Sequence, residues 1–291
     1  MTTTVPATAK SIWVDLLGAE VRYYDAAGIR TRSIESGTGE TIIMLHGIGG
    51  HAEAFARNVV PLGEHFNARS IDYYGHGFTD YGGKPFVKDT YVRHLIDFMD
   101  AAGIKKAHLI GESLGGWIAA WAAIDYPDRV GKVIYTVGAH LKVPIDEATQ
   151  AKTAAGQAEL MRLSKQFMAE PNRANVHARL KWLFYKPDRD INDELIDLRW
   201  ALYQRALGKP NPASALGKTE SELTPEVLAR IPRPMLFLWT DHNPSQQAKT
   251  AKAAMQYVKD AEWAMIEDAG HWPQWEHPDE FNRIVTAYLN K

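Results

Sequence analysis

The stretch Gly111-Glu-Ser-Leu-Gly115 decides how this chain is interpreted. It has the form G-x-S-x-G, follows the apolar run 107–110 and precedes the small and apolar stretch 117–123. A serine hydroxyl is a weak nucleophile until a base takes its proton, and a tight strand-to-helix turn lifts that hydroxyl above a sheet. Glycines flank such a turn because a Cβ would collide with it. The pattern predicts Ser113 as a nucleophile; an ordinary strand-to-helix loop is the alternative.

The composition narrows the class of protein. With 291 residues, 45% of them hydrophobic, the chain can form one large domain with an insertion, or two small domains. The formal net charge of −2 gives no field that would attract nucleic acid or an anionic membrane. The absence of Cys excludes disulfides, thiolate metal sites and a Cys nucleophile, and it fits a reducing compartment.

The N-terminal residues lack a basic region followed by an apolar run, and no apolar stretch approaches the length of a membrane span. We therefore expect a soluble, cytoplasmic protein that acts on a small-molecule substrate. The sequence leaves open whether it works alone or as a homo-oligomer.

Apolar runs alternate with amphipathic stretches along the chain. Residues 21–24 and 31–34 predict an antiparallel pair, and 41–45 a buried central strand. Helical spacing over 91–102 ends at Gly103, and a last helix starts near Asp279. Further strands are expected at 69–72, 107–110, 133–137, 235–239 and 264–266. This order predicts an α/β fold, a mostly parallel sheet with helices on both faces.

Residues 140–222 differ from the rest of the chain, because they have helical periods and no convincing strand. We expect them to form a helical lid inserted into a core made of residues 1–139 and 223–291.

The base that activates Ser113 should be a late histidine that follows a strand, as in the order Ser, acid, His of hydrolases with such a turn. His271 fits, just after the strand predicted at 264–266. The oxyanion needs two backbone N–H groups, which we assign to Leu114 and to Ile48. Gly47 lets the backbone of the Ile48 loop approach a substrate. No histidine has metal-ligand spacing, so neither a metal nor a cofactor is expected.

A rival pattern occupies the same loop. Residues 47–52 match G-x-G-x-x-A after a strand, and Asp72 follows 20 residues after Ala52, as in a dinucleotide-binding fingerprint. The stretch after the motif is a poor apolar helix, however, and this interpretation leaves Ser113 and His271 without a role. We therefore favour the hydrolase.

The acid of the triad should follow the strand predicted at 235–239. Asp241 is the only carboxylate in that loop, which reads Thr240-Asp-His-Asn243. The loop after 133–137 offers no carboxylate before Asp146.

With these features the chain resembles the α/β-hydrolases over about residues 20–290. Two segments resemble the meta-cleavage-product hydrolases, which break carbon–carbon bonds in ring-opened aromatics. One is His271-Trp-Pro-Gln-Trp-Glu-His-Pro278. The other is Trp182-Leu-Phe-Tyr185 with the helix 193–200, in which Arg199 matches an arginine that grips the substrate carboxylate. The resemblance implies that Arg199 binds the substrate carboxylate, although Arg199 could be a solvated helix residue. Trp272, next to His271, is expected to line the pocket, and Trp182 to contact an apolar part of the substrate. The alternatives are a packing role for Trp272 and a place in the lid core for Trp182.

The chain also departs from that group. The group often has Asn before the nucleophile, where this chain has Glu112, which we expect to be no more than a polar side chain. The group's Gly-x-x-Asp register puts Asn243 in the place of the acid, two residues after Asp241. Either Asp241 serves as the acid or the triad is Ser113, His271 and Asn243, in which the Asn carbonyl fixes the histidine tautomer.

The sequence thus predicts a serine-dependent hydrolase that cleaves a carbon–carbon bond of a 2-hydroxy-6-oxo-dienoate-like ring-cleavage product. The alternatives are a carboxylesterase or lactonase that acts on apolar substrates, and a ligand-binding protein that kept the fold without the acid.

Overall fold

The computed structural model describes residues 11–206 and 221–291. Residues 1–10 and 207–220 lie outside the described residues. The first of these ranges is the N-terminal stretch in which no signal peptide is expected, and the second belongs to the predicted insertion 140–222.

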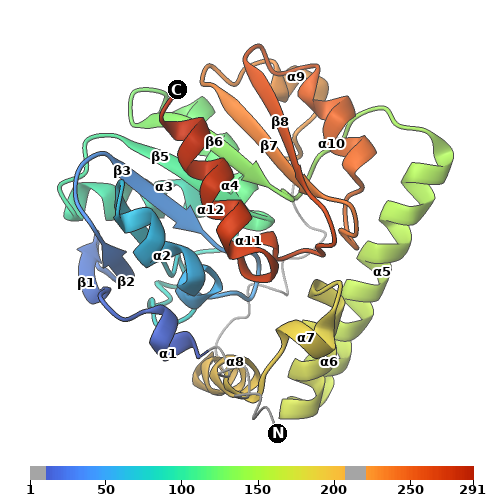
Figure 1. The fold of residues 1–291 in the computed structure, drawn as a ribbon, viewed down its shortest axis with the longest axis horizontal. Coiled ribbons are helices and arrows are strands. Elements are labelled where there is room, and N and C mark those ends of the chain that lie inside the picture. The colour runs from blue at the N-terminus through green and yellow to red at the C-terminus, as the bar shows by residue number, and fades with distance from the viewer. Residues whose placement is uncertain (1–10, 207–220) are drawn as a thin grey trace, which may run out of the picture.

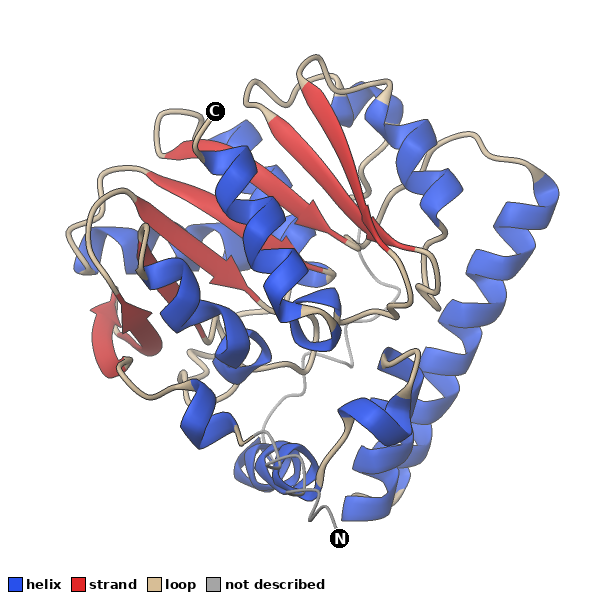
Figure 2. Ribbon diagram, in the orientation of Figure 1, coloured by secondary structure: helices blue, strands red, loops and turns tan. Residues whose placement is uncertain are grey.

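A single eight-stranded sheet forms the centre of the molecule (Figure 2), in the order β1-β2-β4-β3-β5-β6-β7-β8. β2 pairs antiparallel with both β1 and β4, and the other neighbours are parallel, so the predicted mostly parallel sheet is confirmed. The strands are β1 Glu20–Ala26, β2 Ile29–Ser36, β3 Thr41–Leu45, β4 Asn67–Ile71, β5 Ala107–Glu112, β6 Val130–Thr136, β7 Met235–Thr240 and β8 Ala261–Ile266.

Helices cover both faces of the sheet (Figure 1). One apolar core lies on one face of the sheet, under α2 Ala56–Gly63, α11 Pro273–Glu276 and α12 Pro278–Leu289. Two short helices lie beside α2: α1 Ile12–Asp15 and the 3₁₀ helix η1 Ala52–Phe55. On the other face α3 Lys88–Ala101, α4 Leu114–Asp125 and α10 Ala248–Met255 enclose a second core, and α9 Pro225–Leu228 adds Leu228 to it. Strands between two such layers are covered on both sides, so every residue of β5 and β7 is buried, and most of these residues are apolar.

The insertion between β6 and β7 is helical where it is described, with α5 Glu147–Ala169, α6 Arg173–Leu183, α7 Pro187–Asp190 and α8 Asp193–Ala206. In Figure 1 this block lies beyond the carboxyl ends of the strands. A single bridge between Leu141 and Leu223 closes its base. Side-chain caps start α5 and α6, where Asp146 and Asn172 each accept a hydrogen bond from the first turn. That this block acts as a lid stays a prediction.

None of the helices in the described ranges is both long and apolar enough to cross a membrane.

Candidate active site

The turn between β5 and α4 holds Ser113 in a strained conformation, with φ 54° and ψ −115°. A Cβ on Gly111 would overlap the carbonyl oxygen of Gly115, and one on Gly115 would overlap that of Leu45. Both glycines of the motif are therefore required sterically. The turn places Ser113 at the carboxyl end of β5, where parallel sheets of this kind bind ligands.

His271 lies in the loop between β8 and α11, and 4% of its surface is exposed. Its Nδ1 lies 2.8 Å from Oδ1 of Asn243. The Asn243 amide is oriented by its own Nδ2, which donates to the carbonyl oxygen of Gln246 at 2.7 Å. Oδ1 is thus an acceptor, so Nδ1 carries the ring proton and Nε2 is left as the base. Burial lowers the pKa of His271 to about 3, so the imidazole is neutral near pH 7.

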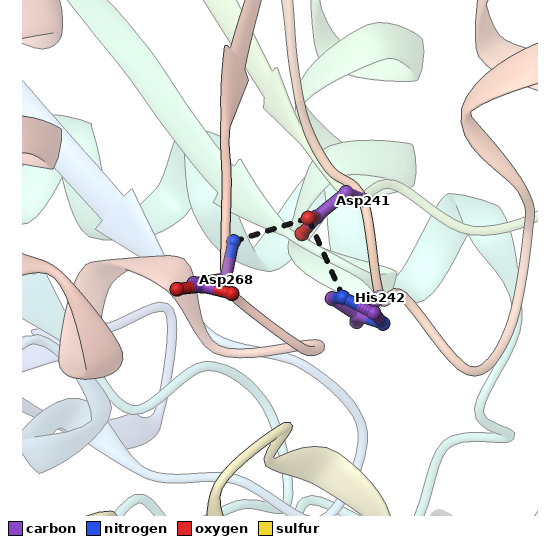
Figure 3. A group of neighbouring side chains, drawn as sticks. All are labelled: Asp241, His242 and Asp268. Carbon is purple, nitrogen blue, oxygen red and sulfur yellow. Dashed lines mark hydrogen bonds and ion pairs between the residues drawn. The ribbon is translucent and has the colours of Figure 1, made fainter.

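Asp241, the other candidate for this position, serves a different part of the loop. Its carboxylate accepts a hydrogen bond from the backbone N–H of Asp268 at 3.1 Å (Figure 3). It also accepts one from the N–H of Ala269 at 3.3 Å. The prediction that Asp241 orients His271 is therefore not supported by the geometry. The chain turns sharply after β7, and Asn243 rather than Asp241 faces the imidazole.

Asp241, His242 and Asp268 also form an exposed group whose ligand atoms lie within 4.8 Å of one another (Figure 3). Sequence spacing did not reveal it, because Asp268 belongs to a different loop. Asp268 has Lys186 Nζ as a partner at 3.1 Å, and we assign no ion to this group.

The two N–H groups expected to bind an oxyanion belong to Ile48, after β3, and Leu114, at the start of α4. Within the described residues, neither N–H is used in a hydrogen bond. Ile48 and Leu114 line the same cavity as Ser113 and His271. Free donors beside a nucleophile are what an oxyanion hole requires.

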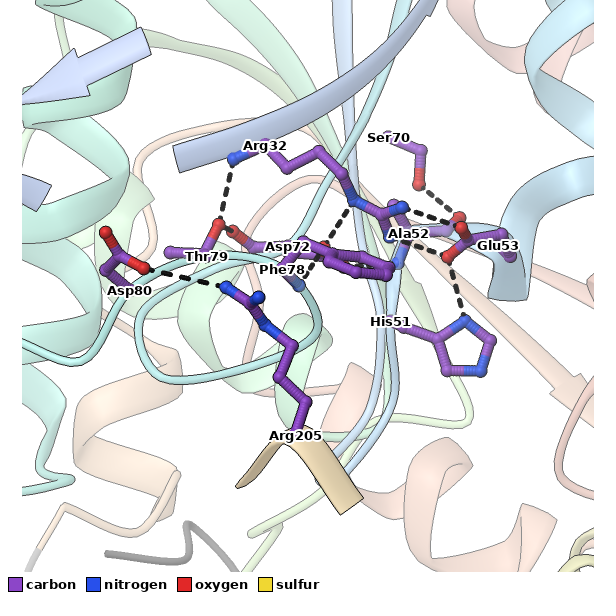
Figure 4. A network of polar contacts seen from close by, with 10 residues as sticks. All are labelled: Arg32, His51, Ala52, Glu53, Ser70, Asp72, Phe78, Thr79, Asp80 and Arg205. Atoms are coloured by element: carbon purple, nitrogen blue, oxygen red, sulfur yellow. Dashed lines mark hydrogen bonds and ion pairs between the residues drawn. The ribbon is translucent and has the colours of Figure 1, made fainter. Parts of the chain in front are cut away.

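A buried polar network holds the loop that carries Ile48 (Figure 4). Asp72, without exposed surface, accepts from the N–H of Ala52 at 2.6 Å and of Phe78 at 2.8 Å, and from Arg32 Nε at 2.6 Å. Arg32 also forms a bidentate pair with Glu53, at 2.7 Å for both bonds. This position of Asp72 argues against the dinucleotide-binding alternative, because its carboxylate is fully used inside the protein.

A small pocket of about 20 Å³ with two buried arginines lies beside Ser113, between the core and helices α5, α6 and α8. Arg199 is 3% exposed, and its guanidinium carbon lies 5.1 Å from the centre of the Trp272 ring. One Arg199 nitrogen donates to the carbonyl oxygen of Gly49 at 2.8 Å, and its Nη1 has no hydrogen-bond partner. An unpaired buried guanidinium nitrogen is costly, so this pocket is suited to an anionic ligand group.

Arg179, on α6, lines the same pocket and is 5% exposed. Its Nη1 donates to the Tyr203 hydroxyl at 3.1 Å, and burial lowers its pKa. Sequence reasoning missed Arg179, because nothing in its helical surroundings distinguishes it from a solvated arginine.

A second cavity, of about 250 Å³, adjoins the first at Ser113, and its lining mixes apolar side chains with polar ones such as Gln157 and Gln246. Trp182, whose ring centre lies 5.7 Å from that of His271, borders both cavities. The remaining apolar lining comes from Leu114, Ala139, Leu141, Leu160 and Met161.

Glu112 does more than sequence reasoning expected. It has no exposed surface, accepts a hydrogen bond from the N–H of Gly47 at 2.6 Å, and lies 3.2 Å from His271 Nε2. Burial raises its pKa to about 8, although the Gly47 N–H and the charge of Arg199 act in the opposite direction.

This arrangement of strained serine, buried histidine and free N–H groups can perform acyl transfer to a serine. The sequence model of the alpha/beta hydrolase family matches residues 42–284, so the chain belongs to the alpha/beta hydrolase family.

Within that family its relatives include meta-cleavage-product hydrolases, as the sequence predicted. The 2-hydroxy-6-oxo-6-phenylhexa-2,4-dienoate hydrolase of Burkholderia cepacia is 30% identical over 279 residues, covering 88% of this chain and 89% of that protein. The 2-hydroxy-6-oxo-6-(2'-aminophenyl)hexa-2,4-dienoic acid hydrolase of Metapseudomonas resinovorans is 24% identical over 279 residues, covering 93% and 91%. Among solved structures, the naproxen esterase of Bacillus subtilis matches with a TM-score of 0.76 at 21% identity, covering 96% of this chain and 95% of that one.

Proposed function

We propose that this protein is a serine-dependent hydrolase that cleaves a carbon–carbon bond of a 2-hydroxy-6-oxo-dienoate-like compound. The observation that carries the proposal is the pair of buried arginines, Arg179 and Arg199, in the pocket that also contains Ser113, together with an adjoining cavity of about 250 Å³ that has apolar side chains in its lining. A dienoate product of ring cleavage has the matching shape, since a carboxylate lies at one end and an aromatic or alkyl group at the other. The names of the two relatives support the same class of substrate.

In this mechanism Arg199 binds the carboxylate, and its unpartnered nitrogen gains a hydrogen bond when substrate enters. Binding fixes the remote carbonyl beside Ser113, with its oxygen toward the N–H groups of Ile48 and Leu114. His271 assists the conversion of the dienol to a ketone, in which a proton moves from the enol oxygen to carbon, so that the departing carbon can later leave as a stabilised carbanion.

Ser113 then attacks the carbonyl as His271 Nε2 takes its proton. The carbon–carbon bond breaks, the carbanion receives a proton, and an acyl group remains on Ser113. Water releases that acyl group in a second step with the same base. Helices α5 to α8 would act as a lid, because Trp182 and Arg199 bring the insertion into contact with the reacting groups.

A carboxylesterase is the second candidate, and the site gives a specific reason for it. Ser113, His271 and the two N–H groups require nothing of the substrate beyond an acyl carbonyl, and the cavity of about 250 Å³ has enough room and apolar lining for an acyl chain.

One experiment separates the two candidates. Purified protein is assayed with a ring-opened biaryl dienoate and with a neutral p-nitrophenyl ester, and kcat/KM is compared. A carbon–carbon hydrolase should prefer the dienoate by at least a hundredfold. Preference for the ester would contradict the first candidate, and turnover of neither would contradict both.

A further inference from the structure

The two sides of the His271 ring face different kinds of partner. Its Nδ1 faces the Asn243 amide oxygen, which carries no charge. A serine triad has a carboxylate at this position, where it stabilises the imidazolium that forms when the serine loses its proton. In this chain the imidazolium would have no such partner on the Nδ1 side.

A carboxyl group lies on the opposite side of the ring instead. Glu112 is wholly buried at the end of β5, and its Oε1 lies 3.2 Å from His271 Nε2. Oε1 makes no hydrogen bond, so this oxygen is available to the imidazole. The other oxygen, Oε2, is held by the N–H of Gly47 at 2.6 Å.

The surroundings of Glu112 are built to accept this side chain. A Cβ at position 47 would lie 2.7 Å from Oε2 and 2.9 Å from Oε1, so only glycine fits there. A buried carboxyl group is expensive unless the fold uses it, and no guanidinium or ammonium group of the described residues forms an ion pair with Glu112. Its position beside Ser113 and His271 therefore points to a role in the reaction.

We propose that Glu112 is a catalytic residue, the carboxylate that pairs with the His271 imidazolium on its Nε2 side in place of an acid at Nδ1. The proposal rests on the proposed function only in taking Ser113 as nucleophile and His271 as base.

The proton balance of this step is simple. Before attack, Glu112 is ionised and His271 is neutral with its proton on Nδ1. As the bond between Ser113 Oγ and the acyl carbon forms, the Oγ–H bond breaks and the proton moves to Nε2, while the carbonyl π electrons move to the oxygen. The imidazolium then lies in ion-pair distance of Glu112 until it gives the proton to the leaving group, which restores the starting pair.

The step needs the ionised form of Glu112, and this gives it a pH dependence. The groups that face Glu112 are His271, Arg199 from α8, the Gly47 N–H and the Tyr73 phenol. Burial outweighs Arg199 and Gly47 and raises the pKa of Glu112 to about 8. Below that pH the carboxyl group is neutral and cannot pair with an imidazolium, so the reactivity of Ser113 should rise as pH increases through about 8.

The test uses Glu112→Gln, whose amide oxygen still accepts from Gly47 while the charge is lost. The readout is the second-order rate of Ser113 labelling by an alkyl fluorophosphonate from pH 6 to 10, which requires no knowledge of the substrate. We expect Glu112→Gln to label at least a hundredfold more slowly at pH 9 and to lose the rise near pH 8. Asn243→Asp added to Glu112→Gln should recover at least tenfold, because it returns a carboxylate to the Nδ1 side.

Labelling of Glu112→Gln within threefold of wild type, or a rise near pH 8 that persists in this variant, would overturn the proposal. A wild type that labels well but turns over neither dienoate nor ester would refute the proposed substrates and leave this inference standing. A second measurement needs no loss of activity: in ¹⁵N-histidine spectra, the Nε2 shift of His271 should change near pH 8 in wild type and stay constant in Glu112→Gln. The same change in both proteins would exclude direct pairing.

Discussion

At the scale of single residues, Ser113 is the group on which the proposed chemistry depends. Its φ of 54° is strained for a residue with a Cβ. The fold keeps this conformation in a turn that admits only glycine at positions 111 and 115. Ser113→Ala keeps this backbone and removes the nucleophile, so kcat should fall by about 10⁴-fold or more. Steady-state kinetics and ligand titration of the variant check this, and we expect the affinity for product to persist. A kcat near that of wild type would contradict the assignment.

The two buried arginines give a test of substrate charge. Arg199→Met should reduce kcat/KM for a dienoate by about 2–4 kcal/mol, because a charge-assisted hydrogen bond in a closed site is lost. Arg179→Met should reduce it by about 1–3 kcal/mol, since this side chain keeps Tyr203 as a partner. A neutral ester should be hydrolysed almost as well as by wild type.

Arg205→Met is the matched control for these variants. Arg205 is on α8 as well, but it lies near Asp80 at 3.7 Å, away from the pocket. Equal losses on the dienoate and the ester in Arg199→Met would indicate that its bond to Gly49 shapes the loop, and would contradict carboxylate recognition.

At the scale of elements, the end of α6 and the loop that carries His271 are joined by backbone contacts. The N–H of His271 donates to the carbonyl oxygen of Leu183 at 2.6 Å. Glu276 on α11 accepts from Gly270 N–H at 2.8 Å and from Tyr185 N–H at 3.0 Å. The insertion and the candidate base are thus positioned by one carboxylate.

Glu276→Gln should loosen this junction, because an amide has one acceptor oxygen and its NH₂ group would face a second N–H. We expect a loss of about 1–3 kcal/mol in unfolding free energy and at least a tenfold lower kcat. Chemical denaturation and kinetics measure the two effects. Glu280→Gln, at a half-exposed position on α12, is the control and should change neither quantity. If Glu276→Gln matches it, the junction does not position His271.

Local sequence signals predicted the elements well and the acid position poorly. The glycines around Ser113, the turn at residues 27 and 28, and the apolar runs of β3 and β7 are each determined by neighbours in sequence. Whether Asp241 or Asn243 meets His271 depends on how the chain turns after β7. The role of Glu112 depends on how the loop after β3, which contains Gly47, packs beside the His271 ring. Both are long-range packing results, which a local pattern does not contain.

At the scale of the whole molecule, the buried titratable groups predict how stability depends on pH. Burial lowers the pKa of seven histidines. The pKa falls to about 4 for His76, His94 and His140 and to about 3 for His271, and it is also lowered for His46, His51 and His108. These groups are protonated near pH 6.5 in the unfolded chain but not in the native one. Stability is therefore lost as pH falls from about 6.5 toward 4, by up to about 3 kcal/mol for each of the histidines whose pKa falls to about 4.

Three buried carboxyl groups act in the opposite direction: Glu112, Glu276 and Asp72, whose pKa is also raised by burial. Burial raises the pKa of Glu112 to about 8 and of Glu276 to about 7, so the native state holds protons that the unfolded chain releases above about pH 4.5. Their effect lowers stability as pH rises from 4.5 to 8. Between 4.5 and 6.5 the histidines outnumber them, and above 6.5 the carboxyl groups act alone. We therefore expect maximal stability near pH 6.5.

Urea unfolding at half-unit steps from pH 4.5 to 9 measures this profile. Glu112→Gln should flatten the alkaline side, and His94→Gln should make the acid side less steep. His65→Gln, which changes an exposed histidine, is the control and should keep the wild-type slope. The slope is the informative quantity, because each substitution also shifts stability by a constant amount through lost contacts. A stability that increased steadily from pH 5 to 8 in wild type would mean that Glu112 is ionised at neutral pH. The rise in Ser113 reactivity that we expect near pH 8 would then occur at lower pH.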